Sequence, residues 1–382
     1  MTRMLVVSHT DHSREGGVWY GWGPTVREVD ALAAAVGDVV HVCVASPEPP
    51  TGASLPYRSG KVRVSAVPGA GGSSLWDKLR VFVRFPGYAQ AILRELSRVD
   101  AVHIRAPANI SLLAMVLLAF VRRPTKRWIK YAGNWQPQGR EPLSYRFQRW
   151  WLERNFARAK VTVNGRWPEQ PPHIVTFPNP CLTEEQLKSA HAIARSKRLY
   201  SPAKLLFAGT LLPEKGARLA IDAFQVLRES GVQAELAIAG DGPARLELED
   251  YARRKVGPSD ISFLGYVAHM ELFREFEYAH FAILPSSSSE GWPKVLGEGM
   301  AHGAVPIASA VSSIPQVLAE AGCGRAVASF DPHEYARAIL DYLEEPERWR
   351  REVEAGCAYA ERFTYEAHVQ RVKDLLGLDE NP

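Results

Sequence analysis

The chain has 382 residues, of which 46% are hydrophobic and 23% are charged, a balance that excludes a disordered chain. At this length a single core rarely keeps growing, so two domains of roughly 180 residues are expected. The net charge is only +4, but residues 1–182 carry +12 and residues 183–382 carry −8. Eight of the ten tryptophans lie in the first half. That half is therefore expected to contact something both anionic and amphiphilic.

The cysteines and the hydropathy pattern exclude further classes of protein. The four cysteines show no metal-ligand spacing, so we expect reduced, buried thiols without a disulfide framework. The longest apolar run, residues 110–121, is too short to span a bilayer, and the start of the sequence reads directly as a strand rather than a leader. A cytoplasmic protein is therefore expected. Because the sequence contains no Asp-x-Asp pair, we expect neither a bound metal nor another cofactor.

Short β-rich runs alternate with helical patterns in the first half. The predicted strands are residues 4–8, 39–45, 62–67, 101–104, 128–131, 161–163 and 174–177, and the predicted helices are residues 25–35, 75–96, 111–121 and 143–157. This alternation predicts a doubly wound α/β domain with a parallel sheet. After the first strand, Gly16 and Gly17 are expected to precede a helix and to let the backbone approach a phosphate or sugar; a plain flexible turn is an equal alternative.

The second half repeats the same scheme more clearly. Its predicted strands are residues 204–208, 234–239, 261–264, 281–284, 305–308 and 325–327, each followed by a helical pattern. Between the halves, Pro178-Asn179-Pro180 breaks regular structure and the polar segment 187–198 is interpreted as a linker. We therefore predict Rossmann-like domains at residues 1–182 and 200–362. The last helix, about residues 364–378, is expected to pack back on the first domain.

The most informative stretch is residues 286–298, in which Glu290 and Glu298 flank a Ser-rich Gly-Trp-Pro turn. The pattern predicts a strand end, a tight loop and a helix whose first residue is Pro293. A helix N-terminus offers free N–H groups and partial positive charge, which favour a phosphate. Glu298 would lie about 7 Å along this helix at ~1.5 Å per residue. The alternative is that one glutamate serves the helix dipole and the other is merely solvated.

Two further turns follow predicted strands of the second half. The first contains Gly209, Thr210 and Lys215, and this lysine would reach an anion near the next helix start. The second contains Tyr266 and Val267, whose backbone groups could meet a base edge, although a structural turn is equally compatible. A third turn, residues 240–243, lacks the last glycine of a dinucleotide fingerprint, which disfavours a dehydrogenase.

Together these motifs resemble the family 4 glycosyltransferases, which are retaining enzymes of the GT-B fold that use nucleotide-activated sugars. The resemblance implies two Rossmann-like domains facing each other across a cleft. It also implies transfer of a hexose-type sugar from a nucleotide-diphosphate donor to an acceptor hydroxyl. The roles that it implies are catalysis by Glu290 and Lys215, and substrate binding by Gly16, Gly17, Asn134, Gly209, Thr210, Tyr266, Val267, Gly291, Trp292, Lys294, Val295 and Glu298.

The sequence departs from the family pattern in three places. Thr210 stands where an arginine is usual, so one cation for the leaving diphosphate is missing. Pro293 replaces a frequent glycine and removes an amide donor. No histidine lies near residues 131–135, where the family often has one; Asn134 and His103 are the candidate substitutes. A non-catalytic subunit that binds nucleotide sugars is therefore the alternative function, while no motif supports nucleic-acid binding.

Residues 122–160 combine basic and aromatic side chains. Eleven basic residues lie there against two glutamates, interleaved with Trp, Tyr and Phe residues. A basic amphipathic helix over residues 143–157 suits an anionic lipid surface. We therefore expect a peripheral protein of the inner membrane face whose acceptor is a lipid-linked saccharide. The alternative is that Trp150 and Trp151 pack into the core and that the arginines are only solvated.

Overall fold

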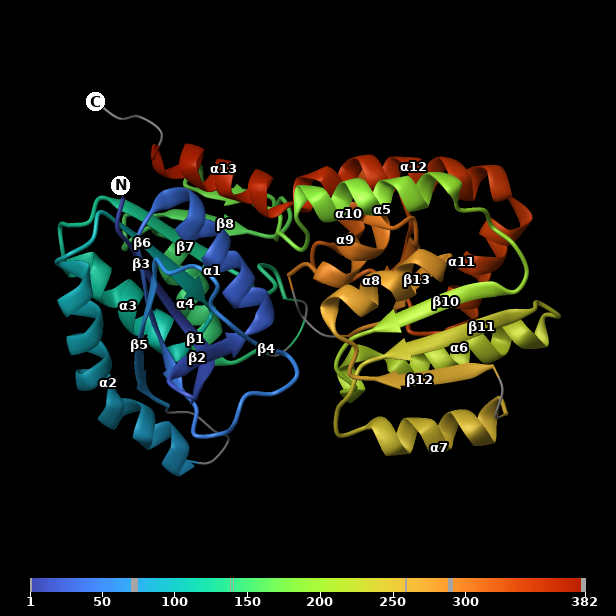
Figure 1. Cartoon of the computed structure of the whole chain (residues 1–382), viewed down its shortest axis with the longest axis horizontal. Helices are drawn as coiled ribbons and strands as arrows, with labels where there is room; N and C mark the ends of the chain where they lie inside the picture. Colours follow the sequence, from blue (N-terminus) through green and yellow to red (C-terminus); the bar gives the residue numbers. More distant parts are fainter. Residues whose placement is uncertain are drawn as a thin grey trace. The chain divides into compact units, whose positions relative to one another are not determined.

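The computed structural model describes residues 2–69, 75–137, 139, 141–257, 260–287 and 291–378; for residues 75–82 it describes the backbone only. The chain forms two compact units (Figure 1). Unit 1 consists of Met1–Pro178 and Tyr365–Pro382, and unit 2 of Asn179–Thr364. The chain thus leaves unit 1 at the expected Pro-Asn-Pro break and returns to it with its last helix.

Unit 1 is built on a mainly parallel sheet. Its strands are β1 (Met4–Glu15), β2 (Val18–Trp22), β3 (Val39–Ala45), β4 (Ser54–Pro56), β5 (Val62–Pro68), β6 (Ala101–Ala106), β7 (Lys126–Tyr131), β8 (Lys160–Val163) and β9 (Ile174–Thr176). The parallel strands follow the order β5-β3-β1-β6-β7-β8-β9. The chain therefore reverses its direction of winding between β1 and β6, since β3 and β5 lie on one side of β1 and the later strands on the other.

Helices cover both faces of this sheet. They are α1 (Gly23–Val36), α2 (Leu75–Leu96), α3 (Asn109–Phe120), α4 (Leu143–Glu153) and α13 (Tyr365–Leu376). On β1, Met4 and Val6 join the core under α1 and α13, while Leu5 and Val7 join the core under α2 and α3. Successive strand residues point to opposite faces, so an unbroken apolar run indicates a sheet that is buried on both sides.

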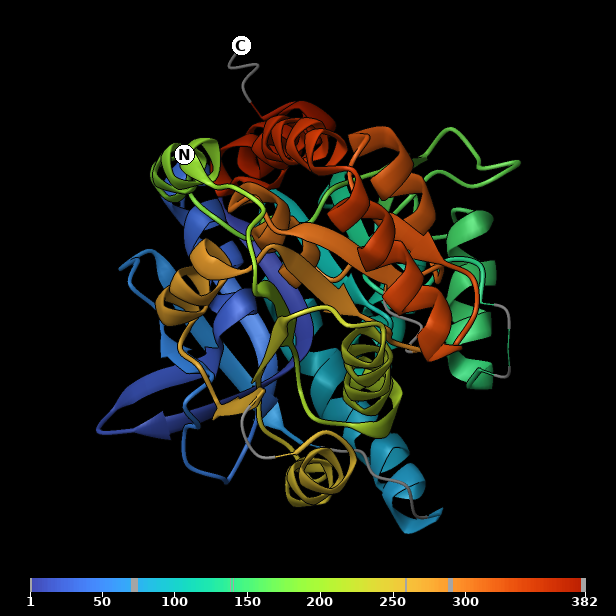
Figure 2. The same ribbon diagram turned by 90° about the vertical axis from the view of Figure 1, so that its right-hand side faces the viewer.

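The glycine pair after the first strand lies in a β-hairpin. Glu15 pairs with Val18 across it, and Gly16 and Gly17 have φ values of 56° and 85°. The prediction that these glycines precede a helix is wrong, because the strand pattern continues through the pair and α1 begins only at residue 23. Two consecutive residues with positive φ are what a tight hairpin turn requires. In Figure 2 the hairpin, in dark blue, projects from the body of unit 1.

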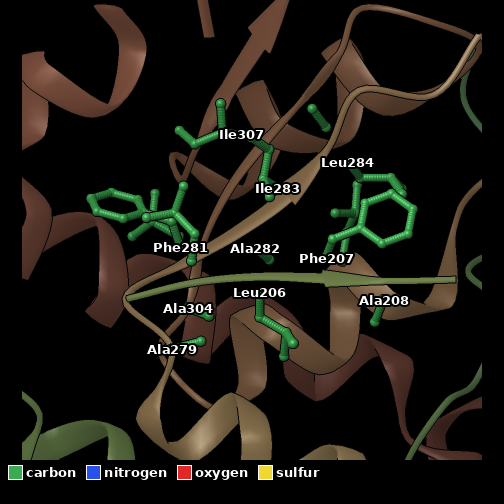
Figure 3. Close-up of a cluster of buried hydrophobic side chains, with 14 of the residues drawn as sticks. Leu206, Phe207, Ala208, Ala279, Phe281, Ala282, Ile283, Leu284, Ala304 and Ile307 are labelled. Atoms are coloured by element: carbon green, nitrogen blue, oxygen red, sulfur yellow. The ribbon is translucent and has the colours of Figure 1, made fainter. Parts of the chain in front are cut away.

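Unit 2 contains a second, fully parallel sheet. Its strands are β10 (Ala203–Ala208), β11 (Ala234–Ala239), β12 (Ile261–Gly265), β13 (Phe281–Leu284), β14 (Val305–Ser309) and β15 (Arg325–Val327). Their order is β12-β11-β10-β13-β14-β15. In Figure 3, Leu206 and Ala208 point to one side of β10 and Phe207 to the other, and all three are buried. Both faces of this sheet are therefore core, as its short apolar strands predict.

Two helical layers cover the sheet of unit 2. The helices are α5 (Glu184–Ser196), α6 (Ala217–Glu229), α7 (Arg245–Lys255), α8 (His269–Tyr278), α9 (Lys294–Ala301), α10 (Ile314–Ala321), α11 (Pro332–Glu344) and α12 (Pro346–Ala360), with 3-10 turns η1 (Pro213–Lys215) and η2 (Glu361–Phe363). One layer groups α5, α8, α9 and α12, and the other groups α6, α7 and α11. Figure 1 shows α5 and α12 side by side.

Helix α5 occupies the segment that was predicted to be a linker. Thr183 and Gln186 form a reciprocal capping box at its start, and Leu187, Ala190 and Ala194 are buried along one face. The prediction of a linker over residues 187–198 is therefore wrong. The apolar signal was weak, because the helix buries one leucine and two alanines. Their helical spacing is correct, but the polar residues between them dominate the composition.

Two predicted helix ends are displaced. Helix α4 ends at Glu153 rather than at residue 157, because Asn155 and Arg158 have φ values of 51° and 50°. These left-handed conformations cannot continue an α-helix. Helix α9 begins at Lys294, with Pro293 as its N-cap residue instead of its first helical residue.

Candidate functional site

The strand order of unit 2 marks one edge of its sheet as a binding edge. Strands β10 and β13 are neighbours, but the chain continues from β10 to one side and from β13 to the other. The loops at the carboxyl ends of these two strands therefore diverge, which is where ligands bind in doubly wound sheets. The loop after β10 carries Gly209, Thr210 and Lys215, and the loop after β13 leads into Gly291.

Direct contacts hold these two loops together. The Glu214 carbonyl oxygen accepts hydrogen bonds from Ser286 Oγ at 3.0 Å and from the Ser287 amide at 2.9 Å. Gly216 has a φ of 82°, and a Cβ atom there would lie 2.0 Å from the Pro285 carbonyl oxygen. Lys215 lies between these contacts and is half-buried. Its position relative to the loop after β13 is therefore determined by backbone packing.

The turn after β12 reaches the same edge of the sheet. The Gly240 amide donates to the Gly265 carbonyl oxygen at 2.7 Å, and a Cβ atom on Gly240 would lie 1.9 Å from the Gly209 carbonyl oxygen. The loops after β10, β11 and β12 are thus in mutual backbone contact. Tyr266 follows Gly265 and is 50% exposed, and Val267 is half-buried. Both residues are therefore at least partly exposed on unit 2.

His269 and Glu298 form a pair at this edge. His269 is the first residue of α8 and Glu298 lies on α9; His269 Nε2 is 3.0 Å from Glu298 Oε1. Because a carboxylate accepts, the histidine donates from Nε2. Glu298 is only 6% exposed, so this bond offsets part of the cost of burying its charge. Sequence reasoning missed His269, although it follows Val267 by two residues and begins a helix.

The start of α9 is only partly described. Glu290, together with Ser288 and Ser289, lies outside the described residues, so the predicted bracketing of a phosphate by two carboxylates stays a prediction. Gly291 is buried, and its carbonyl oxygen accepts a 2.6 Å hydrogen bond from Ser313 Oγ. Trp292 is 5% exposed and stacks on Phe363 at 5.6 Å. Its indole is therefore part of the core, which leaves the backbone as the part of Trp292 that can meet a ligand.

Lys294 and Val295 are the first two residues of α9. Both are half-buried, and Val295 packs against the core of unit 2. Glu298 follows Lys294 by four residues, about one helical turn. The lysine side chain and the glutamate side chain are therefore on the same face of the helix.

Unit 1 has a cavity of about 790 Å³ at the carboxyl ends of its strands. His9 and Asp11 line it from β1, Asn109 from the start of α3, and Tyr88 and Tyr145 from α2 and α4. Burial lowers the pKa of His9, and the positive charge of Arg105 lowers it further. The imidazole is therefore neutral near pH 7 and can both donate and accept hydrogen bonds. The sequence pattern indicated Gly16 and Gly17, which come later in the chain. It did not identify the side chains that line this cavity.

A chain of hydrogen bonds supports the strand that carries His9 and Asp11. Ser8 Oγ is 2.7 Å from His41 Nε2, and the Tyr57 hydroxyl is 2.6 Å from His41 Nδ1 and 2.7 Å from His12 Nε2. His12 Nδ1 is 2.9 Å from the Thr10 carbonyl oxygen and must donate to it. If both rings are neutral, the Tyr57 hydroxyl donates to His12 Nε2, His41 Nδ1 donates to the Tyr57 hydroxyl, and Ser8 Oγ donates to His41 Nε2. Burial lowers the pKa of His12 and of His41, which agrees with that state.

The two candidates for the missing family histidine are not in this cavity. His103 is fully buried in the middle of β6 and stacks on Trp128 at 3.6 Å, so the prediction that it can substitute for the family histidine is wrong. Asn134 is 9% exposed, and its Oδ1 accepts from the Gln136 amide at 3.1 Å. Its carbonyl group thus stabilises a local turn. Neither residue belongs to the lining of the His9 cavity.

The basic, aromatic segment of unit 1 divides into internal and surface residues. Arg127 and Lys130 are buried, and Arg149 is ion-paired with Glu141 and donates to the Tyr131 hydroxyl at 3.3 Å. These three cations therefore have structural roles. The surface residues include Arg146 and Arg154, together with the apolar side chains of Leu143, Tyr145, Phe147, Trp150 and Phe156, which are 38–79% exposed.

The alternative that Trp150 and Trp151 pack into the core is correct for only one of them. Trp151 packs partly against the core of unit 1, whereas Trp150 is 40% exposed and lies under the Arg154 guanidinium at 4.7 Å. Their rings and those of Phe147 and Phe156 contact one another. Helix α4 therefore presents an aromatic surface with cations beside it. Within the described ranges, no helix is long and apolar enough to cross a bilayer.

Comparison with solved structures identifies the fold. Sucrose-phosphate synthase from Thermosynechococcus elongatus aligns with a TM-score of 0.70 at 18% identity, over 98% of each chain. Anabaena Alr3699/HepE, solved in complex with UDP and glucose, aligns with a TM-score of 0.67 at 13% identity, over 99% of this chain and 100% of that chain. WaaG, a glycosyltransferase involved in lipopolysaccharide biosynthesis, aligns at 0.63 and 16% identity over 98% and 100%. The chain therefore has the GT-B fold of glycosyltransferases.

A match to a family model is more specific than these structural comparisons, and it lies within unit 2. Residues 192–357 match the family model "Glycosyl transferases group 1". A GDP-mannose-dependent alpha-(1-6)-phosphatidylinositol dimannoside mannosyltransferase of Mycobacterium tuberculosis is 30% identical over 200 residues. Alpha-D-kanosaminyltransferase of Streptomyces kanamyceticus is 26% identical over 197 residues. Each match spans 50% of this chain and 50% of the relative.

Proposed function

We propose that the protein is a retaining glycosyltransferase of family 4 that moves a hexose-type sugar from a nucleotide-diphosphate donor to a hydroxyl group of an acceptor. The group 1 domain over residues 192–357 supports this proposal. The observation that carries it is the buried Glu298 carboxylate, which His269 holds beside the turn of residues 265–268. A buried carboxylate at the binding edge of a doubly wound sheet is suited to the hydroxyl groups of a ribose.

In this proposal the donor lies along the carboxyl edge of unit 2. Glu298 accepts from the ribose hydroxyls, and the backbone at Tyr266 and Val267 meets the base. Lys215 and the N-terminal end of α9 hold the diphosphate, because a helix N-terminus and a cation both favour negative charge. Lys294 begins that helix and supplies positive charge that the family arginine would supply at Thr210.

The chemistry follows from where negative charge develops. The bond between the sugar C1 and the diphosphate oxygen breaks, so charge accumulates on the leaving oxygen. Fixed donors stabilise that transition state more than the ground state. The acceptor oxygen bonds to C1 on the face that the diphosphate leaves, and its proton passes to the departing phosphate. No protein nucleophile is needed, and Glu290 is assigned to the hydroxyls of the transferred sugar.

We assign the acceptor to the cavity of unit 1. His9, Asp11 and Asn109 offer the neutral and charged polar groups that a sugar hydroxyl requires. A lipid-linked saccharide is the proposed acceptor, since the aromatic surface of α4 suits a membrane interface and one relative is named for a phosphatidylinositol dimannoside substrate. The protein would then be peripheral on the cytoplasmic face of the membrane.

The alternative is a partner subunit that binds nucleotide sugars without turnover, which Thr210 and the absent family histidine favour. A thermal-shift screen with UDP-, GDP-, ADP- and TDP-sugars tests binding, since a ligand at 100 times its Kd adds about 2.7 kcal/mol of stability. Transfer or slow hydrolysis of the stabilising donor supports the enzyme. Tight binding without either reaction supports the subunit, and no response to any donor contradicts both.

A further inference from the structure

Unit 1 contains a second cavity that the proposed function does not use. It has a volume of about 310 Å³, and Lys126 and Lys160 line it. These are the first residues of β7 and β8. Because the strands are parallel, the cavity lies at the amino ends of the sheet, whereas His9 and Asp11 mark the cavity at the carboxyl ends. The two cavities therefore belong to opposite edges of one sheet.

The lining of this second cavity is strongly cationic. Lys126, Arg127, Arg158 and Lys160 all line it, together with His173, and no carboxylate is among its lining residues in the part of the chain that the structure describes. Lys126 Nζ donates to the Gly377 carbonyl oxygen at 2.6 Å, which leaves two of its three hydrogens for other acceptors. Four like charges around a small space are unfavourable unless an anion shares it.

Arg127 gives the cavity a fixed positive charge. The residue is 4% exposed, and its guanidinium donates to the carbonyl oxygens of Leu118, Val121, Pro124 and Ala157 at 2.7–2.8 Å. Those acceptors are backbone dipoles, so they orient the side chain without cancelling its charge. Burial lowers the pKa of Arg127, and the nearby charge of Arg158 lowers it further. The two guanidinium groups thus interact unfavourably in the absence of an anion.

The loop after α4 holds the other cations in place. Asn155 Oδ1 accepts from the Ala159 amide at 2.8 Å, and Asn155 and Arg158 both adopt positive φ values. His173 Nε2 donates to the Leu152 carbonyl oxygen at 2.8 Å, which orients its ring beside the cavity. Arg158 and Lys160 are exposed at the cavity. Their backbone is therefore constrained while their side chains can close on a ligand.

We propose that this cavity binds a phosphate group, with Arg158, Lys160 and Lys126 as its direct ligands and Arg127 as a fixed charge behind them. A phosphate monoester carries about two negative charges and three acceptor oxygens, which matches several converging cations. The position at the amino ends of the strands makes the site independent of the donor and acceptor sites proposed above. It would regulate the protein or anchor it.

The same phosphate chemistry has two sources, a soluble phosphate or a lipid headgroup. Phe156, which is 40% exposed, lies in the same loop as Asn155 and Arg158 and contacts Trp150 at 5.4 Å. The cationic cavity is thus continuous along the chain with the aromatic surface of α4. Phosphatidic acid has an exposed phosphate monoester, whereas phosphatidylglycerol has only a diester. A comparison of vesicles of equal surface charge therefore separates specific binding from general attraction.

The test uses the full chain and the double variant Arg158→Asn with Lys160→Thr. Asparagine tolerates positive φ, and threonine suits the first position of a strand, so the fold should persist. The control variant is Lys61→Thr with Arg94→Gln, which removes the same charge from exposed positions of unit 1. Thermal unfolding of each variant checks the fold, and nucleoside diphosphate binding checks that unit 2 is unaffected.

With the donor site of unit 2 saturated by a nucleoside diphosphate, we expect the double variant to lose at least tenfold in affinity for inorganic pyrophosphate, or in its preference for phosphatidic acid over phosphatidylglycerol vesicles, while the control keeps both. Loss of pyrophosphate affinity alone identifies a soluble phosphate as the source, and loss of the vesicle preference identifies a lipid. If the folded double variant binds both probes as the original protein does, the proposal is wrong. Because donor binding is measured separately, this result leaves the glycosyltransferase assignment untouched.

Discussion

His269 Nε2 lies 3.0 Å from Glu298 Oε1, which joins the first residue of α8 to a buried carboxylate on α9. The bond occupies one carboxylate oxygen and restricts the rotation of the group. The other oxygen is then oriented before any ligand arrives. Preorganisation of this kind lowers the entropic cost of binding.

Replacement of Glu298 by alanine is expected to weaken nucleoside diphosphate binding. Loss of a hydrogen bond to a charged group costs about 1.5–3 kcal/mol, roughly 10- to 150-fold in Kd. His269→Ala should have a smaller effect, because it removes only the support of the carboxylate. Titration calorimetry with the cognate diphosphate measures both values. A larger loss for His269→Ala than for Glu298→Ala would contradict the assigned roles.

Lys215→Ala is expected to lower kcat more than it raises KM. If the ammonium stabilises charge that develops on the leaving diphosphate, its loss costs roughly 10²-fold in turnover. Lys188→Ala is the matched control, because that lysine is exposed on α5. Steady-state kinetics with the donor found in the thermal-shift screen gives both constants. Equal kcat values for the two variants would remove Lys215 from catalysis.

Reversal of Arg146 and Arg154 to glutamate is expected to reduce binding to anionic vesicles. Each basic residue near headgroups contributes about 1 kcal/mol, so loss of the two should cost at least about 30-fold. Cosedimentation at low and high salt measures the effect, which should shrink as salt rises. Phe147→Ser with Trp150→Ser should also reduce binding, but without that salt dependence. Unchanged vesicle binding in both double variants would exclude the membrane surface on α4.

Arg149 lies near Arg146 and Arg154 in the chain, but it has a structural role instead of a surface role. Its guanidinium is ion-paired with Glu141 and donates to the Tyr131 hydroxyl. Reversal of Arg149 should therefore destabilise unit 1, at a cost of about 3–5 kcal/mol for breaking a largely buried pair. Chemical denaturation measures this loss, and a variant as stable as the original would show that the pair contributes little.

Acid is expected to destabilise unit 2 in a defined pH window. Burial lowers the pKa of His280 and of His302 to about 4, from 6.5. Between these values the unfolded chain binds more protons than the folded one, so stability falls as pH drops from about 6.5 to about 4 and is then constant for these groups. Protonation of each histidine lowers the free energy of unfolding by at most about 3 kcal/mol.

Urea unfolding at pH 7.5, 6 and 4.5 measures this loss. His302 Nδ1 donates to the Glu298 carbonyl oxygen at 2.8 Å, and asparagine can keep that donor while removing the titration. His302→Asn should therefore flatten the pH dependence, although it lowers stability at pH 7.5. An equally steep dependence in the variant would assign the acid sensitivity to other groups.

Most secondary structure followed from local patterns. The predicted ranges of α2, β3, β11, β13 and β15 agree with the structure to the residue, because their apolar spacing is regular and turn residues bound them. Helix α5 and the hairpin at Gly16 were mispredicted. In both, the local signal was weak: α5 buries only one leucine and two alanines, and a Gly-Gly pair suits either a hairpin or a loop before a helix.

Short stretches of sequence determined which segments form strands and helices. They also determined the break at Pro178–Pro180 and the motif around Glu298, since each depends on neighbours within a few residues. Only the tertiary structure decided which residues meet. It replaced His103 with His9 as the histidine of the cavity in unit 1, and it paired His269 with Glu298. It also buried Arg127 and Lys130 inside a segment that is basic throughout. Such contacts depend on strand order and on which face each residue takes, and side chains far apart in the chain meet only once the sheets have formed.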